Sequence, residues 1–97
     1  MIEKKNLAMK MSDTEQVHFK KPFTALLTVQ GEDHFVVSSH ELGISAQAET
    51  LTKASQFFKA KFVELAVDLH SKSKYAPLSG KERERHEKIL ETCDIHG

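Results

Sequence analysis

The residues of this chain that could do chemistry are its single cysteine and its six histidines. Cys93 and His96 have the Cys-x2-His spacing that can supply two ligands to a zinc ion. A structural zinc site needs four such ligands, and no second pair in the sequence has a matching spacing. We therefore expect no metal site and no cofactor.

Nucleophilic and acid–base catalysis find little support in the sequence. A Cys–His pair needs a third orienting group and a formed pocket, and Cys93 lies near the end of the sequence, a poor place for either. His40 next to Glu41 could act as a general base, but neighbours of this kind are common, and we expect both to be solvated. No phosphate-binding loop is formed by the glycines, which are Gly31, Gly43, Gly80 and Gly97. We expect a protein that is not an enzyme.

Composition limits the remaining classes of function. The 97 residues are enough for one domain, and 14 basic and 14 acidic residues cancel, so no strong global field attracts nucleic acid. With one cysteine there is no intrachain disulfide, as in a reducing compartment. No apolar run approaches the roughly 20 residues that span a membrane, and residues 1–10 lack the apolar core of a signal peptide. We expect a cytoplasmic protein that has no membrane partner.

Alternating apolar residues predict the strands. Residues 1–16 are polar without a sustained period, which predicts a flexible N-terminal tail. Residues 17–30 alternate in period 2, with Pro22 expected at the strand start or on an edge. A turn at Gly31 then leads to an antiparallel hairpin partner over residues 34–39, and residues 44–48 form a short third strand.

One long amphipathic helix follows, from about residue 51 to about residue 71. Thr50 is a good N-cap, and an apolar stripe that includes Phe58 and Phe62 should face the sheet. Phe57, Val63 and Val67 widen the apolar arc beyond what a three-stranded sheet would cover. This surplus predicts a contact with a partner.

A second, very polar helix is predicted to run to about residue 92, opened by the capping box Ser79-x-x-Glu82. Its carboxylates, Glu82, Glu84 and Glu87 among them, are expected to form a solvated face. Because its apolar anchors are so few, it should be a surface helix or an arm that docks on another subunit. The anchors are Ile89, Leu90 and Cys93.

These elements predict an α+β fold: a three-stranded antiparallel sheet with one long helix packed on it, in the order β-β-β-α, plus a C-terminal polar helix. The expected divisions are a tail at 1–16, the β-β-β-α domain at 17–72, and a linker with the second helix at 73–97. A chain this short gains from association, so we expect a homodimer. The expected partner-binding residues are Phe57, Val63, Val67, Ile89 and Leu90.

Residues 35–54 resemble the N-terminal domain of HicB-like antitoxins. In that family a hairpin leads to a Pro-Glu-Leu corner, a glycine, a short strand and a Gly-Asp-Thr-Leu helix start followed by an alanine. The matching residues are Glu41-Leu42, Gly43, Gln47, Thr50-Leu51 and Ala54. The corner here is one residue shorter, His40 stands in place of its proline, and Ala48-Glu49 in place of Gly-Asp.

The resemblance covers about residues 23–69 and implies a degenerate ribonuclease H-like fold without catalysis. It also implies a role in binding and masking a small RNA-cleaving toxin. Family members usually carry a C-terminal DNA-binding domain, for which residues 78–97 are too few. The alternative function is a small nucleic-acid-binding or phage-type regulatory protein that uses the N-terminal lysines, which are Lys4, Lys5, Lys10, Lys20 and Lys21.

Overall fold

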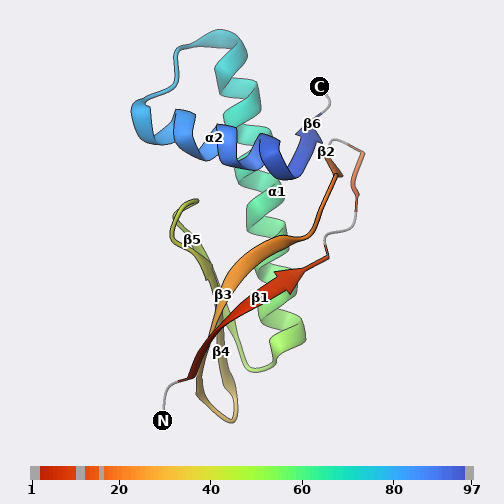
Figure 1. Ribbon diagram of the computed structural model, residues 1–97, viewed down its shortest axis with the longest axis vertical. Coiled ribbons are helices and arrows are strands. Elements are labelled where there is room, and N and C mark those ends of the chain that lie inside the picture. The colour runs from red at the N-terminus through yellow and green to blue at the C-terminus, as the bar shows by residue number, and fades with distance from the viewer. Residues whose placement is uncertain (1–2, 11–12, 16, 96–97) are drawn as a thin grey trace.

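The computed structural model describes residues 3–10, 13–15 and 17–95. It shows an α+β fold, as predicted, in which two helices accompany a four-stranded antiparallel sheet and a two-stranded ribbon (Figure 1). The sheet has the order β1-β3-β4-β5, so it holds one strand more than the sequence predicted. Its strands are β1 (Glu3–Met9), β3 (Phe23–Gly31), β4 (His34–Ser39) and β5 (Ile44–Ala48).

Strand β1 lies where the sequence pattern predicted a flexible tail, and that prediction is wrong for Glu3–Met9. The strand pairs antiparallel with β3, from Glu3 opposite Val29 to Met9 opposite Phe23. Only its C-terminal half reaches the core, where Met9 is 4% exposed. This segment is mostly polar and lacks the alternation of apolar residues that predicts a strand. Its strand conformation depends on the pairing with β3. Residues 1, 2, 11, 12 and 16 of the predicted tail lie outside the described residues.

The single strand predicted over residues 17–30 is two strands. Strand β2 (Val17–Phe19) leaves the main sheet and pairs with β6 (Cys93–Ile95), while β3 begins just after Pro22. Pro22 has no N–H for a ladder, which explains the break and agrees with its predicted place at a strand start. The ribbon therefore joins an early segment of the chain to a late one.

The corner between β4 and β5 is built around Gly43. This glycine has φ +66°, a left-handed conformation that residues with a Cβ rarely adopt. Its N–H donates to the Ser39 carbonyl at 2.9 Å, and a Cβ at this position would lie 2.5 Å from Nη2 of Arg85. Leu42 is fully buried beside it.

Helix α1 (Leu51–Tyr75) crosses one side of the sheet, over β4 and β5. Thr50 caps it as predicted, since its Oγ1 accepts from the Lys53 N–H at 3.2 Å. The helix runs past the predicted end near residue 71 to Tyr75, and ends where Pro77 pushes the preceding Ala76 into an extended conformation. Its buried stripe is Ala54, Phe58, Phe62, Ala66 and Leu69.

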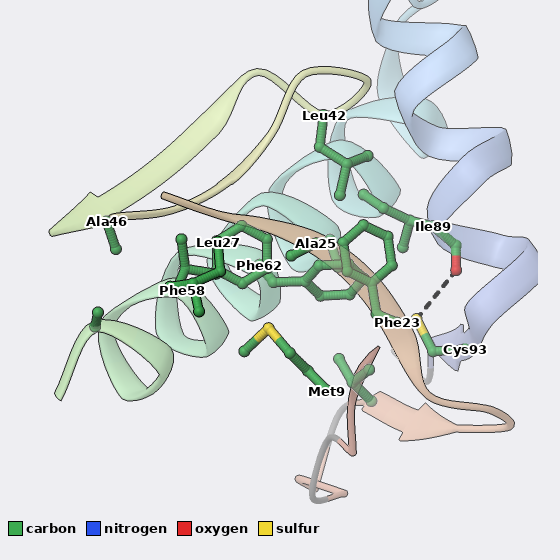
Figure 2. Packing of buried hydrophobic residues seen from close by; sticks show 14 of the residues in the cluster. Met9, Phe23, Ala25, Leu27, Leu42, Ala46, Phe58, Phe62, Ile89 and Cys93 are labelled. Carbon is green, nitrogen blue, oxygen red and sulfur yellow. Dashed lines mark hydrogen bonds between the residues drawn. The ribbon is translucent and has the colours of Figure 1, made fainter. Parts of the chain in front are cut away.

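An aromatic cluster forms the centre of the core (Figure 2). The ring of Phe23 on β3 lies 5.1 Å from Phe62 and 6.0 Å from Phe58, measured between centroids. Phe19 on β2 lies 5.6 Å from Phe62. The predicted core positions Phe58 and Phe62 are thereby confirmed, and Phe62 joins the sheet to the ribbon.

Helix α2 (Gly80–Thr92) packs on its own chain. The predicted capping box is present, with the Ser79 and Glu82 side chains each bonded to the other's backbone N–H. The Lys72 ammonium donates to the Glu82 carboxylate at 2.6 Å, which links α2 to α1. Ile89 is fully buried. The prediction that this helix is an arm for another subunit is therefore wrong for Ile89, whose side chain completes the core.

Two phenylalanines of α1 offer a matched test of this packing. Phe62→Ala should lower the free energy of unfolding by about 3–5 kcal/mol, because it removes contacts with both Phe19 and Phe23 and leaves a cavity. Phe57→Ala, at a side chain that is 52% exposed, should change it by no more than about 0.5 kcal/mol. Urea unfolding of both variants measures the difference, and equal losses would contradict the placement of the helix.

Candidate interaction surface

One face of the main sheet carries no helix. On β3 the side chains of Ala25 and Leu27 point into the core, while Thr24, Leu26 and Thr28 alternate onto the opposite face. In Figure 1, α1 runs behind the sheet and leaves this opposite face toward the viewer. Leu26 is 37% exposed there, surrounded by hydroxyl and amide side chains. We call this surface the open face.

A cleft of about 570 Å³ lies where the open face meets α2. Asn6, Thr24 and Ser38 line it from the sheet, and Lys88 and Thr92 line it from the helix. The corner closes it with His40 and Glu41, while Lys21 lies at the start of β3. These groups can donate and accept hydrogen bonds around the apolar side chain of Leu26, which is the chemistry of a binding surface.

An acidic patch adjoins the cleft and shares Glu41 with it. Four carboxylates surround a single lysine in a second hollow of about 310 Å³. The Lys88 ammonium lies 3.3 Å from the Glu41 carboxylate and 3.8 Å from that of Glu91, so it offsets only part of the negative charge. The sequence predicted the α2 carboxylates as a solvated face but did not show that Glu41 of the corner joins them. The acidic patch is Glu41, Glu84, Glu87 and Glu91.

The residues predicted to bind a partner do not form one surface. Phe57 is 52% exposed and Leu90 is 36% exposed, whereas Val63 and Val67 are half-buried against the core. Phe57 and Val63 are six positions apart, which places them about 120° from each other around the helix. Together with the burial of Ile89, this leaves Phe57 and Leu90 as the accessible members, on different helices.

The cysteine candidate is not accessible. Cys93 is buried, its thiol donates to the Ile89 carbonyl at 3.3 Å (Figure 2), and burial together with the charge of Asp94 raises its pKa to about 11. A thiol with so high a pKa is a weak nucleophile and a poor metal ligand at neutral pH. His96 lies outside the described residues, which contain no group of three His, Cys, Asp or Glu side chains suited to a metal ion. His40 is exposed at the corner.

A basic cluster lies beside the C-terminal end of β1. Lys10, Lys20 and Lys21 surround a small hollow of about 170 Å³ together with Phe19 and Pro22. The Lys20 ammonium donates to the Leu90 carbonyl at 3.0 Å and lies 3.6 Å from the Asp94 carboxylate. These three are among the N-terminal lysines that the sequence predicted for the alternative, nucleic-acid-binding function. The sequence could not show that they converge, because Lys10 comes from the end of β1 and the others precede β3.

Two histidines meet between the helices. The rings of His70 on α1 and His86 on α2 lie 5.7 Å apart, and Nδ1 of His70 and Nε2 of His86 are buried with no hydrogen-bond partner among the described residues. Burial lowers the pKa of His70 below its ordinary value of 6.5, and the charges of Lys74 and His86 lower it further. The folded state therefore favours the neutral form of His70.

Comparison of the chain with protein-family models, with curated proteins and with solved structures finds no match. No helix in the described part of the chain is long and apolar enough to cross a membrane. The open face, its cleft and the two charged clusters are thus the features from which a function can be argued.

The lowered pKa of His70 makes stability depend on pH. Because the pKa of His70 is lower in the folded state, the unfolded chain takes up the proton first, so the stabilisation present above pH 6.5 is lost as the pH falls below it. Urea midpoints at pH 8 and pH 5.5 should show this loss, and His70→Phe should reduce it.

The matched control is His40→Asn, which removes an exposed imidazole and should leave the slope between these two pH values close to that of the unmodified protein. Glu82, whose pKa the Lys72 and Ser79 hydrogen bonds lower to about 2, and Asp13 lose their contributions only at lower pH. A pH slope unchanged in His70→Phe would contradict the assignment.

Proposed function

We propose that this chain is a non-catalytic protein–protein interaction module of the HicB-like kind, which binds a small protein partner through the open face. The observation that carries the proposal is the cleft, where polar side chains surround Leu26 and the acidic patch adjoins. An exposed apolar side chain within a polar rim is the usual composition of a protein interface.

Four residues of the HicB resemblance support this proposal because each has a structural role that suits the motif. Leu42 is the buried corner residue, Gly43 takes the left-handed conformation of the turn, and Thr50 caps α1. Ala54 is fully buried where the first turn of the helix meets the sheet. Strand β1, helix α2 and the ribbon are additions to the β-β-β-α order.

The acidic patch favours a basic partner. An enzyme that cleaves RNA needs a positively charged surface, because phosphate contacts dominate affinity for nucleic acid. Carboxylates on an antitoxin can occupy that surface and so exclude RNA from it. Within this proposal, Glu41, Glu84, Glu87 and Glu91 attract and orient the basic surface of a small RNA-cleaving toxin, and the cleft receives its side chains.

Co-expression tests the proposal. The tagged chain should co-purify with the small protein encoded by the neighbouring reading frame, and Glu84→Lys combined with Glu87→Lys should weaken binding about tenfold or more at low salt. The loss should shrink at high salt, because exposed charges are screened.

Glu64→Lys and Asp68→Lys together form the control, since these exposed acids lie on α1 beside Ile44, away from the patch. Failure of the unmodified chain to bind any small partner, or an equal loss in both charge variants, would refute the proposal.

The basic cluster favours nucleic-acid binding as a second candidate function. Three lysines beside the half-buried ring of Phe19 provide charge for phosphates and an aromatic edge for a base. The acidic patch lies elsewhere on the molecule, so net charge zero does not exclude this local site.

Fluorescence titration with labelled single-stranded RNA and DNA tests this candidate. Binding should weaken as salt is raised, and Lys10→Ala with Lys21→Ala should reduce both the affinity and the salt slope. Lys53→Ala with Lys59→Ala on α1 is the control with the same change of charge. Absence of binding to RNA and DNA at low salt would refute this second candidate function.

A further inference from the structure

The two edges of the main sheet are treated differently by the fold. At the β5 edge, Lys61 of α1 places its ammonium 2.5 Å from the Ser45 carbonyl. Charged side chains at a sheet edge, or a helix that covers it, are common protections against pairing with another chain. Among the described strands β1 pairs only with β3, so its outer edge is open over Glu3–Met9. An unpaired edge of this length is a template for a further strand.

Hydrogen-bonded and non-hydrogen-bonded pairs alternate along a β-ladder, and this alternation shows which main-chain groups of β1 face outward. Gly31 and His34 flank the two-residue turn of the β3–β4 hairpin, and such a flanking pair exchanges hydrogen bonds. The ladder has a register shift between Val29 and Gly31 on β3, whereas β4 pairs without an extra residue from His34 to Ser38. Bonded and non-bonded residues alternate along β4, so Ser38, like His34, turns its main-chain groups toward β3, and its partner Leu26 turns its own toward β4. Asn6 faces Leu26 from the other side. Because Leu26 turns its main-chain groups toward β4, the N–H and C=O of Asn6 do not bond to Leu26 and point away from β3.

The β5 edge agrees with this assignment. Ser45 pairs with Ser38, whose main-chain groups are used toward β3, so the Ser45 carbonyl must point outward. The bond from Lys61 to that oxygen is the bond that an outward carbonyl would make. By the same alternation Lys4 and Ala8 share the outward orientation of Asn6.

Charge and the length of the pairing together favour one register for a second copy of β1. With Asn6 opposite Asn6 in antiparallel pairing, Lys4 faces Ala8, Lys5 faces Leu7, and no two lysines meet. A shift that centres the pairing on Lys5 sets Lys5 against Lys5. A shift in the other direction, which centres it on Leu7, sets Lys4 against Lys10. Like charges directly opposite each other destabilise a ladder, which disfavours the registers centred on Lys5 and Leu7. Centring on Ala8 brings no lysines together but pairs only residues 7–9 of the strand, whereas the register centred on Asn6 pairs all seven residues and is therefore favoured.

We propose that two copies of this chain join through β1, antiparallel about a two-fold axis at Asn6, into one continuous sheet with both α1 helices on the same side. The outward groups of Lys4, Asn6 and Ala8 then bond those of the second copy. The alkyl stem of Lys5 covers the half-buried Leu7 of that copy. The inference goes beyond the proposed function, because it uses the sheet edge and leaves the acidic patch exposed.

The size of the contact predicts its strength. Strand β1 offers seven residues per copy, while a stable interface of standard size uses about 20–30 on each side. The pairing should therefore give a weak dimer whose fraction rises with concentration.

Sedimentation velocity of the purified chain, from about 1 μM to about 1 mM, tests the inference. The matched variants are Ala8→Lys and Ala8→Glu. Ala8 is exposed, and in the dimer residue 8 of each copy faces Lys4 of the other copy, so the contact occurs twice. Ala8→Lys should raise the dimer Kd about tenfold, and Ala8→Glu should lower it by a similar factor. Both shifts should diminish in high salt.

Adding Lys4→Glu to Ala8→Lys should restore the original Kd, because the facing charges are again opposite. Ser45→Lys, which adds the same charge on the protected edge, should leave the Kd unchanged. A monomer at every concentration, or a shift of both Ala8 variants in the same direction, overturns the proposed pairing. Since these measurements use the chain alone, they do not depend on whether a toxin-like partner binds.

Discussion

The ring of Phe62 is the contact on which the other elements depend. It lies against Phe23 of the main sheet and Phe19 of the ribbon, so one side chain of α1 holds both β-structures. Pro22 ends the ladder between these two phenylalanines and allows β2 to leave the sheet. Because β2 pairs with β6, this also fixes the end of α2 and brings Ile89 into the core. Aromatic pairs of this kind add to the hydrophobic stabilisation that burial itself supplies.

A single covering helix determines where the surfaces are. The sheet buries one face against α1, and among the described residues no second helix covers the opposite face. The open face, its cleft and the outer edge of β1 follow from that one-sided arrangement. The fold protects β5 with Lys61 and leaves β1 exposed. Partner binding at the open face and self-pairing at the edge meet at Asn6, which lines the cleft and lies at the proposed two-fold axis.

Charge patterning gives the surfaces their separate characters. Net charge is zero, yet the acidic patch on α2 and the basic cluster around Lys10, Lys20 and Lys21 are distinct places on the molecule. Exposed charges act mainly over a Debye length of about 8–10 Å, so local composition matters more than the total. The sequence predicted only a solvated face for the carboxylates of this helix. In the folded chain, Arg85 lies over Gly43 instead, and the carboxylates meet Glu41.

The sequence by itself determined the features whose causes are local. The β3–β4 turn at Gly31, the Thr50 cap, the capping box of Ser79 and Glu82, and the burial of Phe58 and Phe62 were all predicted. Each depends on residues a few positions apart or on one helical period. Only the tertiary structure decided that β1 is a strand, that Val17 pairs with Ile95, and that Ile89 is buried. The same holds for the candidate site, because Asn6, Glu41 and Lys88 come from three elements. The physical reason is that a ladder partner or a core neighbour distant in the chain leaves no periodic trace in either segment.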